Sequence, residues 1–299
     1  MEHIKINDHT YRYAYDFKKN PDLRATFNAL TSDTFGFSFE QWYQDNNWSY
    51  RYIPYTLFDG EKAVSNVSVS MLDFLVLGEP MKFVQIGTVM TDPNYRGKGL
   101  SRFLMEKVMD EWRDNCDLIY LFANDEVVDF YPKFDFVTAN EHQHCADINS
   151  KNAAPNATKL DLTIEHDMTL LQNCIQNADP ISQIAMQDGD FLIMFFATYI
   201  MQKNIYYIEA LASVVFADYA DDTLRIHDVF CPKGTSLTAI IDALATSSIQ
   251  KITLGFTPTD TTPFDCTLLQ KEDTTLFVER GKDALFTNEK VMFPTLSHT

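Results

Sequence analysis

A basic segment containing two glycines has the residue types that bind a phosphate ester. It runs Thr91-Asp92-Pro93-Asn94-Tyr95-Arg96-Gly97-Lys98-Gly99-Leu100-Ser101. Gly97 and Gly99 allow the backbone to curl so that successive N–H groups point into one concavity. Arg96 and Lys98 add full positive charges. We therefore expect this segment to bind a di- or triphosphate ester.

Two regular elements are predicted to position this segment. Residues 83–90 (FVQIGTVM) are β-branched and aromatic over the length of one strand, and Asp92-Pro93 ends that strand. The apolar residues that follow repeat at helical spacing, namely Leu100, Phe103, Leu104, Val108, Met109 and Trp112. The N-terminus of such a helix adds unpaired N–H donors. This order favours phosphate binding over the alternative of a plain strand–helix turn.

At these residues the chain resembles the GNAT superfamily of N-acetyltransferases, whose signature is Gln/Arg-x-x-Gly-x-Gly/Ala. The matching residues are Asn94-Tyr95-Arg96-Gly97-Lys98-Gly99, with Asn in the first position, which shortens or removes one side-chain donor to the cofactor. The resemblance implies that acetyl-CoA is the cosubstrate. The backbone around Val89, Met90 and Thr91 would hold the pantetheine and the thioester carbonyl. The pyrophosphate would lie on the N–H groups of Tyr95, Arg96, Gly97, Lys98, Gly99, Leu100 and Ser101.

A second matching element follows a predicted buried strand at residues 118–123 (LIYLFA). Residues 130–136 (FYPKFDF) resemble the family pattern Phe-Tyr-x-x-x-Gly-Phe. The resemblance implies that Tyr131 protonates the departing thiolate and that Asn124 contacts the pantetheine arm. The alternative for Tyr131 is a tyrosine packed beneath the sheet. Pro132 predicts a short or bent helix, and Asp135 can adopt the left-handed conformation of the glycine it replaces.

The resemblance implies an α/β (α+β) fold in which a mixed central sheet is flanked by helices. Before the motif strand we predict helices at 22–31 and 38–44 and strands at 52–58 and 64–77. Phe35, Phe37, Phe39, Trp42, Tyr43 and Trp48 lie in or near these helices, and they form either an aromatic acceptor pocket or part of the core.

A polar run with proline and no periodicity, residues 149–158 (NSKNAAPNAT), predicts a linker. It divides the chain into a catalytic domain, 1–148, and a second domain, 159–299. In the second domain a strand at 223–230, a turn with one glycine, a helix at 237–244 and a strand at 252–256 repeat the order of the motif. The chain thus resembles GNAT proteins of the enhanced-intracellular-survival type, which carry an additional GNAT-like domain. A coincidental α/β unit is the alternative.

Composition limits the compartment and the partners. A net charge of −18 argues against nucleic acid as the main partner, and it favours the approach of a cationic amine. The five cysteines show no Cys-x-x-Cys spacing and the first residues lack a signal-peptide pattern, which indicates the cytoplasm. The longest apolar stretch, 191–201, is shorter than the about 20 residues that cross a bilayer, so we expect a buried helix and no membrane contact.

Metal binding is not predicted. His142-Gln143-His144-Cys145 is interpreted as a strand with its polar residues outward, because no second ligand pair accompanies it. The general base stays open, because residues 83–90 contain no Asp, Glu or His. Asp73, Glu126 and the terminal carboxylate of Thr299 are the candidates.

The predicted function is an N-acetyltransferase that moves an acetyl group from acetyl-CoA to a primary amine by direct attack in a ternary complex. An acyl-CoA-binding sensor or scaffold without catalysis is the main alternative, and a structural protein that binds no cofactor is a third. The acceptor is left open among aminoglycosides, polyamines, small metabolites and protein lysines. A homo-oligomer is possible.

Overall fold

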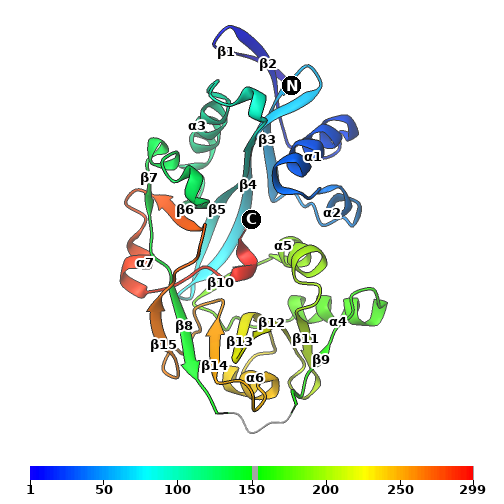
Figure 1. Cartoon of the computed structure of the whole chain (residues 1–299), viewed down its shortest axis with the longest axis vertical. Coiled ribbons are helices and arrows are strands. Elements are labelled where there is room, and N and C mark those ends of the chain that lie inside the picture. Colours follow the sequence, from blue (N-terminus) through cyan, green and yellow to red (C-terminus); the bar gives the residue numbers. More distant parts are fainter. Residues whose placement is uncertain (150–153, 299) are drawn as a thin grey trace.

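A computed structural model describes residues 1–149 and 154–298, which are organised around two β-sheets (Figure 1). Each sheet contains one parallel pair of strands among otherwise antiparallel neighbours, β5 with β6 in the first and β13 with β14 in the second, as far as the described residues go. The mixed α/β fold predicted from the sequence is confirmed.

The first sheet has nine strands. Eight follow the order β1-β2-β3-β4-β5-β6-β16-β7, and β10 pairs with the far end of β4. Helices cover both faces around β4 and β5 (Figure 1), which explains why β4 is a nearly continuous buried run. The strands are β1 (Glu2–Ile6), β2 (His9–Tyr15), β3 (Tyr52–Asp59), β4 (Lys62–Val76), β5 (Glu79–Thr91), β6 (Leu118–Ala123), β7 (Phe136–Thr138), β10 (Ile184–Gln187) and β16 (Thr275–Glu279).

Local signals start and end the helices beside this sheet. Asn20 caps α1 (Pro21–Phe35), because its side-chain oxygen accepts the N–H groups of Asp22 and Leu23, and Gly36 ends the helix at φ 78°. On the same face lies α2 (Glu40–Gln44), whereas α3 (Leu100–Trp112) covers the opposite face (Figure 1). Short 3-10 turns lie at η1 (Pro93–Tyr95), η2 (Asp125–Val127) and η3 (Tyr131–Phe134).

The second sheet has seven strands in the order β15-β8-β14-β13-β12-β11-β9. They are β8 (His142–Asp147), β9 (Thr158–Lys159), β11 (Ile205–Ile208), β12 (Ser213–Ala220), β13 (Thr223–Phe230), β14 (Lys251–Leu254) and β15 (Asp265–Leu268). The accompanying helices are α4 (Glu165–Gln176), α5 (Asp190–Phe195), the π-helix η4 (Phe196–Ile200), η5 (Glu209–Leu211), α6 (Leu237–Leu244), α7 (Ala284–Glu289) and η6 (Thr295–Ser297).

Strands cross the predicted domain boundary in both directions. β8 precedes residue 148 and lies in the second sheet, whereas β16 comes from the last part of the chain and lies between β6 and β7 of the first. β10 also joins the first sheet, through Ile184–Gln187 against 73–76 of β4. The limits 1–148 and 159–299 stay a prediction, and residues 150–153 of the predicted linker lie outside the described residues.

Most of the predicted elements are confirmed, including the strand–turn–helix–strand order in both halves of the chain. The predicted buried helix at 191–201 is α5 continued by η4, with Phe191, Leu192 and Ile193 buried. No helix in the described ranges is long and apolar enough to span a membrane. One expectation is wrong in part: residues 142–147 form a strand, β8, as predicted, but the His144 side chain is 3% exposed and so lies on a covered face of the sheet instead of facing solvent.

Candidate active site

The turn between β5 and α3 has the geometry of an anion-binding loop. Gly97 and Gly99 have φ of 74° and 83°, a region that favours glycine. Within the described chain, no backbone N–H from Arg96 to Arg102 donates a hydrogen bond to another residue. Seven unpaired donors at a helix N-terminus, beside two basic side chains, are an arrangement that suits an anion.

Side chains outside the loop fix its shape. Asn7 Nδ2 donates to the Lys98 carbonyl at 3.0 Å, and the Tyr95 hydroxyl donates to Asp59 Oδ2 at 2.7 Å. This bond to Asp59 raises the pKa of Tyr95 to about 12. An open hollow of about 450 Å³ lies over the loop, between the β1–β2 turn and the solvent side of α3. The sequence analysis missed Asn7 and Asp59, because each supports the loop from a distant strand turn.

Asp92 anchors the start of the loop. Its carboxylate accepts the Asn94 backbone N–H at 2.8 Å and lies 2.6 Å from Lys62 Nζ, and the Lys62 ammonium lowers the Asp92 pKa. The Asn94 side chain turns back to the same carboxylate, at 3.1 Å. The Asn94 side chain therefore forms its hydrogen bond within the protein. This agrees with the shorter side chain that Asn has at a position where the family pattern has Gln or Arg.

The two parallel strands separate just before this loop. β5 pairs with β6 only from Phe83 with Leu118 to Ile86 with Leu121, although both strands continue. On its other edge β5 has a bulge against β4, where Thr88 and Val89 have no register partner and Thr88 has φ 48°. Backbone groups near Val89 are thereby freed from the regular ladder at the point where the strands part, as a pantetheine site requires.

The side chains of two predicted cofactor residues, Thr91 and Ser101, form hydrogen bonds within the protein. Thr91 Oγ1 lies 2.8 Å from Ser65 Oγ and 2.8 Å from Ser101 Oγ, which links β4, β5 and α3. Leu100 is the first residue of α3, and its side chain is buried. These residues can contribute backbone N–H groups to a ligand, whereas the exposed Arg96 and Lys98 can also contribute charge.

Tyr131 begins η3 and is 4% exposed. Its ring contacts Phe130 and Phe277, and it belongs to the cluster of buried side chains that also contains Leu100 of α3. Burial raises the Tyr131 pKa to about 12, so that the phenol keeps its proton at neutral pH. No hydrogen bond of this hydroxyl is found among the described residues. The geometry is compatible with both interpretations, a proton donor and a packed tyrosine.

The two departures from the family pattern near Tyr131 have the expected structural effect. Pro132 lies in a 3-10 helix of four residues, so the helix is short. Asp135 adopts φ 70° and ψ 32°, and its carboxylate accepts Arg280 Nε at 2.7 Å. Asn124 is held by the last part of the chain, because its side-chain N–H groups donate to Asp273. Its predicted contact with a pantetheine arm would require this bond to be exchanged.

The candidate bases lie in different surroundings. Asp73 is paired with Arg51 at 2.8 Å, Glu126 is exposed on η2, and Thr299 lies outside the described residues. His298 is stacked on Phe122 of β6 with ring centroids 3.9 Å apart, and burial lowers its pKa well below the usual value. No grouping of three or more His, Cys, Asp or Glu side chains suitable for a metal occurs within 1–149 and 154–298.

Comparison with known proteins gives one family match, in the first half of the chain. The family model of the acetyltransferase (GNAT) domain matches residues 18–139. No curated protein sequence matches the chain significantly. Among solved structures, a conserved protein from Enterococcus faecalis V583 described as a probable N-acyltransferase has a TM-score of 0.56 at 16% identity, over 93% of this chain and 74% of that chain.

Two further structures cover almost the same extent. The GCN5-related N-acetyltransferase from Kribbella flavida has a TM-score of 0.53 at 12% identity, over 90% of this chain and 71% of that one. Eis1 from Mycobacterium abscessus has a TM-score of 0.51 at 12% identity, over 89% and 72%. At such identities the likeness concerns the fold, which includes both sheets. The match to the GNAT acetyltransferase model is thus confined to residues 18–139, and the likeness of the whole chain to these solved structures is one of fold.

Proposed function

We propose that the protein transfers an acetyl group from acetyl-CoA to a primary amine by direct attack within a ternary complex. One observation carries this proposal: seven unpaired backbone N–H groups, from Arg96 to Arg102, lie directly beyond the point where β5 and β6 separate. A long phosphate ester with a thioester at its other end matches a site with those two parts.

In this proposal each part of the site has one task. The N–H groups of the loop bind the pyrophosphate, with Arg96 and Lys98 adding charge. The backbone around Val89 and Met90 holds the pantetheine and polarises the thioester carbonyl. The neutral amine forms a bond to the carbonyl carbon and the C–S bond breaks. Tyr131 then gives its proton to the leaving sulfur, and burial keeps that proton in place until this step.

The acceptor is proposed to be cationic in solution. The chain carries a net charge of −18, so an ammonium is drawn toward it. Such an amine, with a pKa of about 10, must lose a proton before it attacks. The residue that removes it is left open among Asp73, Glu126 and Thr299. We also propose the cytoplasm as its compartment, on the basis of the cysteine pattern.

The first experiment measures thiol release from acetyl-CoA with a panel of small amines, aminoglycosides, polyamines and lysine peptides. Wild type and Tyr131→Phe are run together. We expect amine-dependent release, with kcat about 100-fold lower in Tyr131→Phe and little change in KM, because only the proton donor is removed.

Tyr55→Phe is the matched control, because Tyr55 is also buried on the α3 side and its hydroxyl accepts a hydrogen bond from Trp112. It should keep full activity. Equal release by wild type and Tyr131→Phe would contradict the role of Tyr131. Acetyl-CoA binding without release for any amine would favour the sensor or scaffold function instead.

A further inference from the structure

A small, mostly apolar pocket lies against the bulge of β5. Thr88 forms one wall, and the other walls are aromatic rings of β3, α2 and α5 with Leu192 and Ser70. The pocket measures about 60 Å³, roughly the volume of two water-sized groups. Engineered cavities that bind benzene are larger, about 150 Å³. The space therefore fits a few carbon atoms in a row and excludes a ring.

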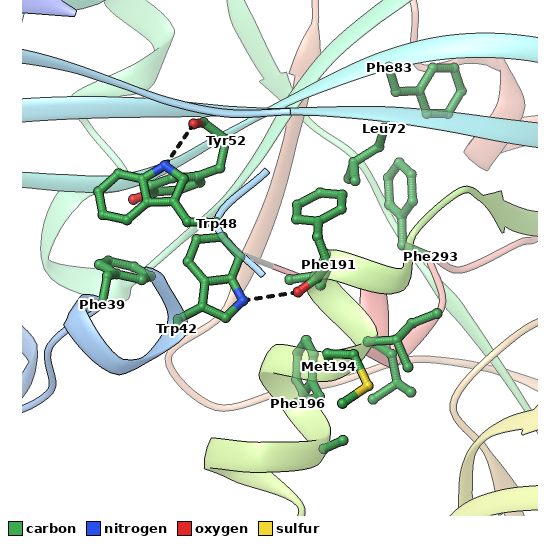
Figure 2. Close-up of a cluster of buried hydrophobic side chains, with 14 of the residues drawn as sticks. Phe39, Trp42, Trp48, Tyr52, Leu72, Phe83, Phe191, Met194, Phe196 and Phe293 are labelled. Carbon is green, nitrogen blue, oxygen red and sulfur yellow. Dashed lines mark hydrogen bonds between the residues drawn. The ribbon is translucent and has the colours of Figure 1, made fainter. Parts of the chain in front are cut away.

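The surrounding packing keeps this space open. Trp42 Nε1 donates to the Phe191 carbonyl at 3.1 Å, which ties α2 to α5 across the pocket, as Figure 2 shows. The rings of Phe39 and Phe195 are stacked with centroids 5.9 Å apart, and those of Trp42 and Tyr52 meet edge to face at 5.5 Å. Interlocked rings of this kind cannot collapse into a small void, since each is held by several others.

One polar group on the wall lacks a partner. Ser70 is 1% exposed, and its hydroxyl has no hydrogen bond among the described residues. The other hydroxyls are satisfied, because Tyr52 and Thr88 lie 2.8 Å apart and bond to each other. Buried polar groups without a partner are rare in folded proteins and indicate a ligand or an ordered water.

The residues that line the pocket indicate whether it binds the acyl group of the donor or the amine of the acceptor. No charged side chain lines the pocket, so an ammonium inside it would exchange its hydration for contacts with aromatic rings alone, without a carboxylate partner. An uncharged alkyl chain has no such cost and gains from burial. The pocket adjoins the backbone that, in the proposed function on which this inference rests, holds the thioester. An acyl chain that extends from that thioester therefore lies next to the pocket.

We infer that this pocket binds the end of a short unbranched acyl group, so that the site proposed for acetyl-CoA also accepts propionyl-CoA and butyryl-CoA and binds them more tightly. Two additional methylene groups buried in it correspond to about tenfold tighter binding. Chains of six carbons exceed the space and gain nothing further.

Calorimetric titration of the full chain with CoA and with acetyl-, propionyl-, butyryl- and hexanoyl-CoA tests this inference without an acceptor. In wild type, affinity should rise about tenfold from acetyl to butyryl and stop there. Ser70→Val narrows the pocket, so butyryl-CoA should bind no better than acetyl-CoA, with CoA affinity unchanged. Phe195→Leu enlarges the pocket and should shift the optimum to hexanoyl-CoA.

Phe196→Leu is the matched control, because Phe196 is the next residue, is 8% exposed and does not line the pocket. It should keep the wild-type chain-length profile. This inference alone would be overturned if wild type bound all the acyl-CoAs equally well, or if Ser70→Val kept the preference for butyryl-CoA. A chain that binds neither CoA nor any acyl-CoA would overturn the proposed function with it.

Discussion

The chain contains the same unit twice, a strand, a turn, a helix and a parallel strand. In the first unit β5 leads through α3 to β6, and in the second β13 leads through α6 to β14. In both, four residues of the first strand pair with the second strand before the pairing ends, at Ile86 and at Ile226. Both first strands also have a bulge against their antiparallel neighbour just beyond that point.

The turns of the two units differ in their glycines and in their basic residues. The first has Gly97 and Gly99, and its N–H groups from Arg96 to Arg102 are unpaired within the described chain. The second has one glycine at positive φ, Gly234, and Pro232, which has no N–H. The Thr235 N–H is also used, because it donates to the Pro232 carbonyl at 3.2 Å. The N–H groups of Lys233, Gly234 and Ser236 to Ala239 donate to no other described residue, so the second turn keeps free donors but has one glycine and one basic residue where the first has two of each.

The space beyond the paired residues differs as well. In the second unit, the segment that leads to β10 is hydrogen-bonded to the residues that follow both parallel strands. The Asp179 N–H donates to the Cys231 carbonyl, just after β13, and the Gln183 N–H donates to the Thr257 carbonyl, just after β14, both at 2.8 Å. Asp228, two residues after the last pair as Thr88 is in the first unit, accepts the Val229 N–H at 2.8 Å. The chain itself thus occupies the positions that a ligand would take in the first unit.

Substituting the turn glycines should give the largest difference in effect between the two units. Gly99→Val places a branched side chain at φ 83° and turns the loop away from its present shape. We expect acetyl-CoA affinity to fall by at least about 100-fold, since several N–H donors are lost together. Gly234→Val, at φ 81° in the second turn, is the control and should lower stability but leave acetyl-CoA affinity unchanged. Calorimetric titration of both variants measures this, and equal losses in the two would remove the functional distinction between the turns.

Removing the Asp228 charge should show how much stability the protein loses by burying that carboxylate in the second unit. Burial raises the Asp228 pKa to about 7, so between about pH 4 and 7 the folded state binds more protons than the unfolded state, and stability falls as pH rises. Asp228→Asn should therefore stabilise the protein by up to about 4 kcal/mol at pH 8 and have little effect at pH 4. Calorimetric unfolding at both pH values checks the difference. A destabilised variant at pH 8 would show that the charge is needed in place.

Loosening the anchor of the first turn should have the smallest effect. Asp92→Asn removes the 2.6 Å ion pair with Lys62 but leaves an oxygen for the Asn94 N–H. We expect acetyl-CoA affinity to fall about threefold to tenfold, because the loop is less preorganised. Lys62→Met should give a similar loss by removing the other partner. If both variants titrate like wild type, the loop holds its shape without the ion pair.

Elements with strong local signals were predictable, and long-range pairings were not. The 83–90 strand, the helix beginning at Leu100 and the 223–230 strand follow from periodicity and turn residues within each segment. Nothing local in 275–279 indicates that β16 joins the first sheet, because that depends on the edge presented by β6. His144 was misplaced for the same reason. Within the site the loop was predictable, whereas the supports from Asn7 and Asp59 lie far away in sequence.

The place of β16 has a consequence for how the protein folds during synthesis. Val278 pairs with Tyr120 on one side and with Val137 on the other, so contacts about 150 residues apart complete the acetyltransferase sheet. Until the ribosome has released residue 279, β6 presents an open edge, and open edges associate with other chains. Closing so long a loop is slow. The first sheet therefore begins to emerge first and finishes folding last, and a chain stopped at residue 148 lacks the strand that covers this edge.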